Sequence, residues 1–102
     1  MFDSSKNGVS LEELGVNNCG LTKLEALEVL SELESNNTPL LGGDVYLKNG
    51  KEVNSTYDNW YCDRIKNESI EEFVTRSLSK AKEYIMSYKN DSSGEVLFAL
   101  VI

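Results

Sequence analysis

The chain has 102 residues, a length that suits one domain, and we expect residues 1–102 to form a single domain around one modest core. Its 17 acidic and 10 basic residues give a net charge of −7, which disfavours binding to nucleic acid or to an anionic membrane and suits a basic protein partner. The sequence has no histidine, which removes the commonest general base and the histidine-containing zinc sites.

Capping-box patterns, in which Ser or Thr is followed three residues later by Glu, predict where the helices start. The pattern Ser10–Glu13 predicts a short helix over residues 11–14, which Gly15 ends. The pattern Thr22–Glu25 predicts a helix over residues 23–34. Its leucines at 24, 27, 30 and 33 lie near one face, which we expect to be the buried face.

A third pattern, Ser69–Glu72, predicts a long helix over residues 70–88, in which the apolar positions recur at helical spacing. The closing segment EVLFALVI, residues 95–102, is predicted to be a strand buried on both faces. With a hairpin before the long helix, the element order is α-α-β-β-α-β. This order indicates an α+β fold with a small antiparallel or mixed sheet of about three strands packed against two main helices.

The hairpin lies within residues 40–62 and turns near Asn49-Gly50. A two-residue Asn-Gly loop would place Lys48 opposite Lys51, an unfavourable pair of like charges. We therefore favour a three-residue loop, Lys48 to Gly50, which pairs Val45 with Val53. In that register five side chains point toward the helices: Val45, Leu47, Val53, Tyr57 and Tyr61. The residues that point away are Asp44, Tyr46, Glu52, Asn54, Thr56, Asp58, Trp60 and Cys62.

A sheet face that carries acids interleaved with large aromatics has what a partner-binding surface needs, because aromatics act as anchors and acids orient the partner. If the helices cover only one face, the other is such a surface. The predicted contact residues are Asp44, Tyr46, Glu52, Asp58, Trp60 and Asp63. The alternative for Trp60 is a place in the core, which is the commonest position for a lone tryptophan.

Two other classes of function stay open. One is a small enzyme that uses Cys62 as nucleophile, or the carboxylates of Asp44, Asp58 and Asp63 as acid, base or metal ligands. The absence of a histidine base favours a packing role for Cys62, and turn capping is favoured for the acids. The other is a homo-oligomeric module that pairs through residues 95–102 or through the open sheet face.

The first residues, MFDSSKNG, lack the apolar stretch of a signal peptide, and the apolar run VLFALVI is too short to cross a bilayer. We therefore expect a cytoplasmic protein with reduced cysteines. In such a protein the excess of acidic residues can also be explained by solubility alone, without a basic partner. Cys19 and Cys62 match no metal or redox spacing. The sequence therefore predicts no cofactor and no metal site.

Four segments together resemble the immunity protein 40 family: SLEELGV at 10–16, LLGGDVY at 40–46, YDNWYCD at 57–63 and SLSKAKEYIMSY at 77–88. The resemblance covers roughly residues 8–102, and GGDVY and NWYC are its most specific parts. Members are small cytosolic antidotes in bacterial polymorphic toxin systems. The resemblance implies an α+β protein without enzymatic activity that binds and neutralises a cognate toxin, as a monomer or a weak homodimer.

Overall fold

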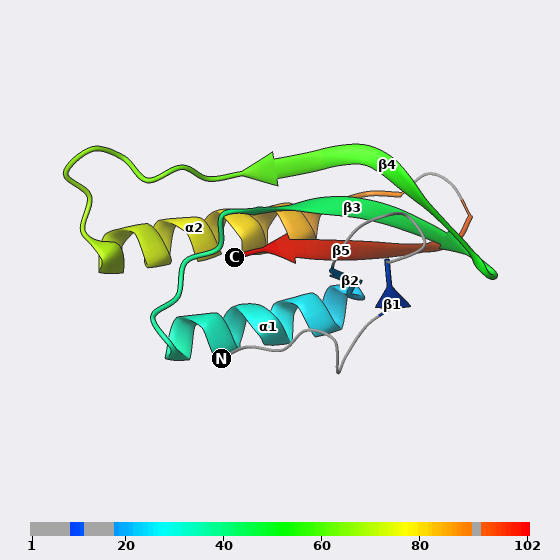
Figure 1. Ribbon diagram of the computed structural model, residues 1–102, viewed down its shortest axis with the longest axis horizontal. Helices are drawn as coiled ribbons and strands as arrows, with labels where there is room; N and C mark the ends of the chain where they lie inside the picture. Colours follow the sequence, from blue (N-terminus) through cyan, green and yellow to red (C-terminus); the bar gives the residue numbers. More distant parts are fainter. Residues whose placement is uncertain (1–8, 12–17, 91–92) are drawn as a thin grey trace.

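The computed structural model describes residues 9–11, 18–90 and 93–102 (Figure 1). Its elements are β1 (Val9–Ser10), β2 (Cys19–Gly20), α1 (Lys23–Ser35), β3 (Gly42–Asn49), β4 (Glu52–Tyr61), α2 (Ile70–Ser87) and β5 (Glu95–Val101). The predicted α+β class and the order from α1 onward are confirmed. The short pair β1 and β2 was not predicted. The helix expected over 11–14 lies, from residue 12, outside the described residues.

Both main helices begin at the predicted capping boxes. Thr22 Oγ1 accepts from the amide of Glu25 at 3.2 Å, and Glu25 Oε1 accepts from the amide of Thr22 at 2.9 Å. The same reciprocal pair forms at the start of α2, at 3.1 and 3.0 Å between Ser69 and Glu72. Each box satisfies two amides that would otherwise lack a helical partner.

The two helices bury different parts of their apolar pattern. In α2 the buried residues follow the predicted spacing: Phe73, Val74, Ser77, Leu78, Ala81 and Ile85. In α1 the buried side chains are Ala26, Val29, Leu30 and Leu33, whereas Leu24 is 65% exposed. The all-leucine face predicted for α1 is therefore wrong at Leu24. A spacing of three residues drifts around a helix of 3.6 residues per turn, so the first leucine falls off the buried stripe. None of the described helices is both long and apolar enough to cross a membrane.

The main sheet has three antiparallel strands in the order β4-β3-β5 (Figure 1). Strand β5 pairs with β3 on one side, and on its other side Phe98 exchanges backbone hydrogen bonds with Leu21 at 2.7 and 2.8 Å. Residues Leu97 to Leu100 are buried, which confirms the prediction of a strand covered on both faces. Strand β4 is thus the edge strand on the opposite side of the sheet.

The hairpin between β3 and β4 has a register that differs from the predicted one. The loop is Gly50-Lys51, with Asn49 opposite Glu52 and Lys48 opposite Val53, so Val45 does not pair with Val53. Gly50 has φ 60°, and glycine is preferred at the first loop position of a type II′ turn. Compared with the predicted register, the pairing is shifted by an odd number of residues. Such a shift turns every side chain of one strand to the other face.

A bulge interrupts β4 opposite Val45, between the pairs Tyr46–Ser55 and Asp44–Asn59. Tyr57 within it has φ 66°, a strained conformation for a large side chain. Side chains satisfy the exposed amides there: Ser55 Oγ accepts from the Tyr57 amide at 3.0 Å, and Thr56 Oγ1 from the Asp58 amide at 3.1 Å. The bulge adds an even number of residues, so the side chains beyond it keep the same faces.

The sheet therefore has a helix side and an outer face with opposite contents. On the helix side a continuous core joins both helices to Val45, Trp60, Phe98 and Leu100. Gly43 makes room there, because a Cβ at this position would overlap Cη2 of the Trp60 indole and lie 2.7 Å from its Cζ3. On the outer face a smaller cluster joins Leu11, Tyr46, Leu97 and Ala99, with Val53 packed at its margin. Both described helices thus pack on the same face of the sheet, which meets the condition set for an outer binding surface.

Candidate functional site

Trp60, the predicted anchor of the binding surface, is part of the core. Its side chain is 6% exposed and stacks on Tyr84 of α2 with ring centroids 4.5 Å apart. It also meets Phe98 edge-on at 6.5 Å. The prediction that Trp60 points away from the helices is wrong, because the actual hairpin register turns it inward. Tyr61, predicted to point inward, lies on the outer face and is 67% exposed.

Tyr46 faces outward as predicted, yet it is buried, because Leu11 and Leu97 pack with it. Burial, and secondarily the nearby Asp44 carboxylate, raise the pKa of the Tyr46 phenol above its usual range. The phenol therefore stays neutral at physiological pH. This packing with Leu11 and Leu97 removes Tyr46 from the set of accessible contact residues.

Two other predicted contact residues, Glu52 and Asp58, lie apart from each other. Glu52 is exposed beside the hairpin loop, opposite Asn49. Asp58 is exposed too, but its carboxylate accepts a hydrogen bond from Tyr88 Oη at 2.6 Å, just beyond the end of α2. Burial and this hydrogen bond raise the pKa of Tyr88. Asp58 thus joins the edge strand to the helix layer and is occupied within the chain.

The remaining two, Asp44 and Asp63, line one surface cavity of about 440 Å³. We call its lining the open patch: Leu41, Gly42, Gly43, Asp44, Asn59, Trp60, Tyr61, Asp63 and Val101. The sequence reasoning missed Leu41, Asn59, Tyr61 and Val101 as contact candidates. The strand register would have identified three of them, because Asp44 pairs with Asn59 and Gly42 pairs with both Tyr61 and Val101.

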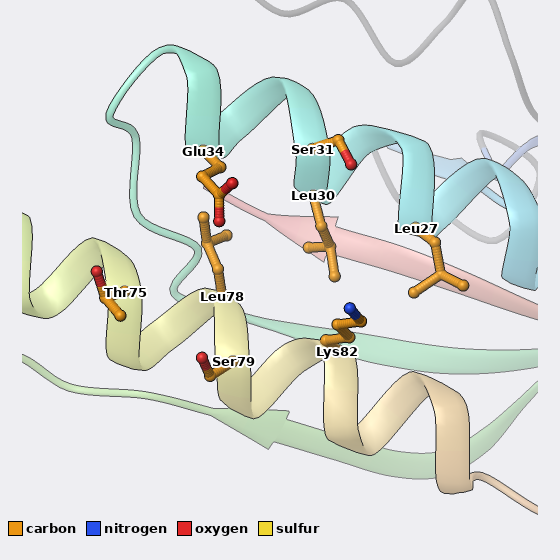
Figure 2. A pocket seen from close by; sticks show the side chains of 8 residues that line it. All are labelled: Leu27, Leu30, Ser31, Glu34, Thr75, Leu78, Ser79 and Lys82. Atoms are coloured by element: carbon orange, nitrogen blue, oxygen red, sulfur yellow. The ribbon is translucent and has the colours of Figure 1, made fainter.

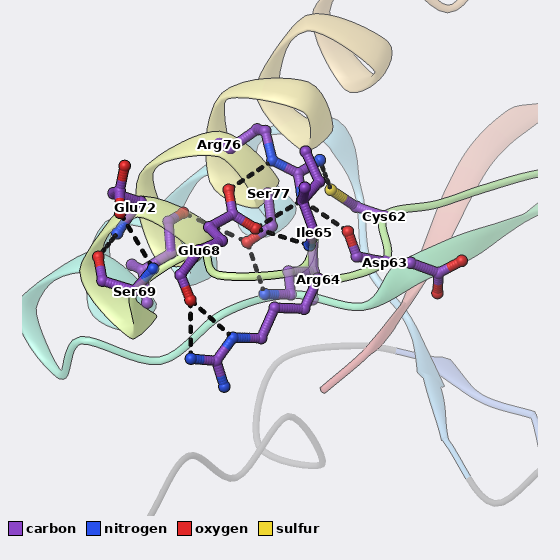
Figure 3. Close-up of polar contacts among 11 residues, drawn as sticks. Cys62, Asp63, Arg64, Ile65, Glu68, Ser69, Glu72, Arg76 and Ser77 are labelled. Carbon is purple, nitrogen blue, oxygen red and sulfur yellow. Dashed lines mark hydrogen bonds and ion pairs between the residues drawn. The ribbon is translucent and has the colours of Figure 1, made fainter.

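The loop after β4 is fixed to α2 by Arg76 (Figure 3). The guanidinium pairs with both carboxylate oxygens of Glu68 at 2.8 Å, and it also donates to the Asp63 carbonyl at 2.6 Å and to Cys62 Sγ at 3.0 Å. Glu68 Oε1 accepts from the Ile65 amide as well, at 3.0 Å. Such two-pronged pairing is geometrically specific, so it holds Asp63 in place beside Tyr61.

Glu68 should make the free energy of unfolding depend on pH. Its hydrogen bonds from Arg76 lower its pKa from 4.5 to about 2. The folded state therefore holds this carboxylate ionised more strongly than the unfolded chain does. The stabilisation is present in full above pH 4.5 and disappears as the pH falls toward about 2. In urea unfolding at a series of pH values, we expect the stability gap between the wild type and Glu68→Gln to narrow across that window.

The matched control for this prediction is Glu28→Gln on α1, an exposed glutamate without a hydrogen bond or ion pair among the described residues. Its gap to the wild type should stay constant over the same pH range. A Glu68→Gln gap that stayed equally constant would show that the Arg76 pair does not act in solution.

Cys62, the candidate nucleophile, is 2% exposed and contacts Arg76, a residue that is not a base at physiological pH. A substrate cannot reach a thiol buried in this way. In a Cys19→Ser background we expect Cys62 to react with a disulfide reagent roughly tenfold or more slowly in buffer than in urea, because buried thiols are inert. A native rate equal to or above the rate in urea would instead support the nucleophile hypothesis.

A second cavity, of about 430 Å³, lies between α1 and α2 (Figure 2). It is lined by Leu27, Leu30, Ser31, Glu34, Thr75, Leu78, Ser79 and Lys82. This lining offers one carboxylate and one ammonium group, and thus no pair of acids for general acid–base work. Among the described residues, no three or more Cys, Asp or Glu side chains are grouped so that they could hold a metal ion.

The comparisons with known proteins agree with the resemblance noted in the sequence. Searches of curated proteins and of solved structures return no match. The family model of immunity protein 40 matches residues 10–102, which include the open patch, the Arg76 contacts and both main helices. Because this match spans nearly the whole chain, the protein belongs to the immunity protein 40 family.

Proposed function

We propose that this immunity protein binds a cognate bacterial toxin domain and neutralises it by direct contact through the open patch. The observation that carries the proposal is the position of Tyr61, which is 67% exposed and lines the same cavity as Asp44 and Asp63 on the sheet face opposite the two described helices. An exposed aromatic flanked by acids combines an anchor with groups that orient a partner. The protein acts by binding and not by catalysis.

The chemistry of the patch favours a basic partner. Within the described residues, neither the Asp44 nor the Asp63 carboxylate accepts a hydrogen bond or forms an ion pair, so both charges are available. The net charge of −7 extends the same attraction over longer distances. A toxin that handles a phosphate-containing substrate would present the complementary positive surface. A standard interface needs about 800 Å² on each partner, which the patch and its surroundings can supply.

The proposed setting is the cytoplasm of the cell that makes the toxin, with the protein as a monomer or a weak homodimer. Self-pairing through β5, one of the alternatives, is disfavoured because β3 and Leu21 occupy both of its edges near Phe98. The described edge strand β4 carries the bulge at Tyr57, which interrupts the regular edge needed for strand addition.

The experiment that tests the proposal measures binding to the toxin domain encoded beside this chain. We expect a one-to-one complex that protects cells from the toxin. The double variant Asp44→Asn/Asp63→Asn should associate roughly three- to tenfold more slowly at low salt, and the difference should shrink at high salt, because acids at the rim act mainly by steering.

Glu28→Gln is the matched control, since it removes charge from an exposed position on α1 in the helix layer. Its effect on association should be much smaller than that of the double variant. The absence of any complex would reject direct neutralisation. A complex that the double variant forms as fast as the wild type would place the contact elsewhere on the protein.

A further inference from the structure

The open patch contains a pocket whose floor is backbone, because two of its residues, Gly42 and Gly43, have no side chain. Gly42 belongs to the outward-facing row that includes Asp44 and adds no side chain there, whereas the space beside Gly43 lies on the helix side and is filled by the Trp60 indole. The cavity of about 440 Å³ is larger than one amino-acid side chain needs. It is a shallow recess, largely open to solvent, that can receive one side chain of a partner.

The side chains around this recess carry negative charges that no cation neutralises directly within the described residues. The Asp44 and Asp63 carboxylates are unpaired within the described residues, and Figure 3 shows the Asp63 carboxylate turned away from the Arg76 contacts. Neither of two neighbouring cations pairs with these aspartates within the described residues: Arg76 pairs with Glu68, and Lys80 Nζ donates to the neutral Tyr61 carbonyl at 2.7 Å. Unlike Asp58, which accepts from Tyr88, the two aspartates accept no hydrogen bond through their side chains from another described residue. The recess thus offers negative charge that a cation can neutralise.

The other lining groups distinguish between cations. Tyr61 presents an exposed ring, Leu41 and Val101 are exposed and apolar, and Asn59 adds an amide. A guanidinium is planar, stacks on aromatic rings, is weakly hydrated and pairs with carboxylates through two parallel hydrogen bonds. A lysine ammonium is a compact, strongly hydrated point charge that gains less from a ring and apolar walls.

The geometry points to an arginine-binding pocket: the recess accepts an arginine side chain, stacked on Tyr61 and paired with Asp44 or Asp63. The identification of the toxin as the source of that arginine rests on the proposed function, whereas the affinity of the pocket for a guanidinium does not. The inference names the chemical group that the partner must insert. It also predicts that arginine and lysine are not interchangeable at that position of the toxin.

The first test uses the protein alone, titrated with N-acetyl-arginine methylamide and followed by amide NMR and by the fluorescence of Trp60, the only tryptophan. We expect saturable shifts at Gly42, Gly43 and Asn59, with a dissociation constant on the order of millimolar, as suits one side chain. The lysine analogue has the same charge and should bind about fivefold or more weakly. The citrulline analogue has a similar shape without the charge and should leave these amides unshifted.

Variants decide where the arginine analogue binds. Asp44→Asn, Asp63→Asn and Tyr61→Ala should each weaken binding about threefold or more, whereas Glu28→Gln should leave it unchanged. The amide spectrum of each variant shows whether it is folded, and the three independent changes keep the test decisive if one variant unfolds. Equal binding of the arginine and lysine analogues, or shifts confined to other regions, would overturn the inference.

The toxin complex separates this inference from the proposed function. Each arginine of the toxin interface is replaced by lysine in turn. At one position the replacement should weaken binding to the wild-type immunity protein but not to its Tyr61→Ala variant. If the toxin binds through the open patch but the arginine analogue does not bind the pocket, the pocket inference fails and the proposed function stands. If the analogue binds but the patch variants leave the toxin complex intact, the pocket stands and the proposed surface fails.

Discussion

Replacement of Trp60 by alanine is expected to lower the free energy of unfolding by about 3–5 kcal/mol, the range typical of a large aromatic removed from a core. The indole is 6% exposed, stacks on Tyr84 and fills the space that Gly43 leaves on β3. Alanine would leave a cavity between the edge strand and α2, and closely packed neighbours relax only partly into such a space. Urea unfolding followed by circular dichroism measures the effect.

Two variants give this prediction its controls. Tyr61→Ala removes the next aromatic along the chain, but from an exposed position, so stability should change by only about 0.5 kcal/mol. Trp60→Phe should cost much less than Trp60→Ala, because most of the ring stays and the lost Nε1 donates to no other described residue. If Trp60→Ala were as mild as Tyr61→Ala, the placement of Trp60 in the core would be wrong.

Tyr61→Ala is expected to weaken toxin binding by about 2–4 kcal/mol, which corresponds to roughly a 30- to 1,000-fold higher dissociation constant. Tyr61 is the large exposed aromatic of the open patch and lines the same cavity as Asp44 and Asp63, whose carboxylates have no partner among the described residues. Truncation of a central aromatic residue of an interface costs the most binding free energy, whereas truncation of an acid at the rim costs little. Isothermal titration of the variant with the toxin domain measures the difference.

The matched control for binding is Leu24→Ala, which truncates another exposed apolar side chain, at 65% exposure on α1 in the helix layer. This variant should bind the toxin as the wild type does. A loss for Leu24→Ala together with unchanged binding for Tyr61→Ala would assign the contact to the helix layer and reject the open patch.

The helices were predictable because their signals are local. A capping box involves residues three apart in the chain, and both boxes at Thr22 and Ser69 form as the pattern predicts. The long helix also has a clear apolar period, which fixes its buried face. The face of α1 was less certain because its leucines are spaced every three residues, and contact with α2 and the sheet selects Ala26 and Val29 over Leu24.

The candidate binding surface was only partly predictable because it depends on a pairing between strands. The outward position of Asp44 follows from the alternation of side chains along β3, and Asp63, a predicted contact beyond the alternating residues, lines the same cavity. The exchange of Trp60 and Tyr61 does not follow from that alternation, because the side of a strand residue changes with a single-residue shift of the loop. The repulsion between Lys48 and Lys51 argued against one wrong loop but could not identify the Gly50-Lys51 loop that forms.

Gly43 and Trp60 lie 17 positions apart in the chain and share one volume, because the indole occupies the space where any Cβ of residue 43 would be. Drift at either position is therefore conditional on the other. A side chain at 43 requires a smaller residue at 60, and it must also be accommodated by the backbone carbonyl of Ala99, 2.9 Å from the position of its Cβ. Tyr61 is 67% exposed and fills no such core space, so under the proposed function the contact surface can vary at this position without disturbing the core.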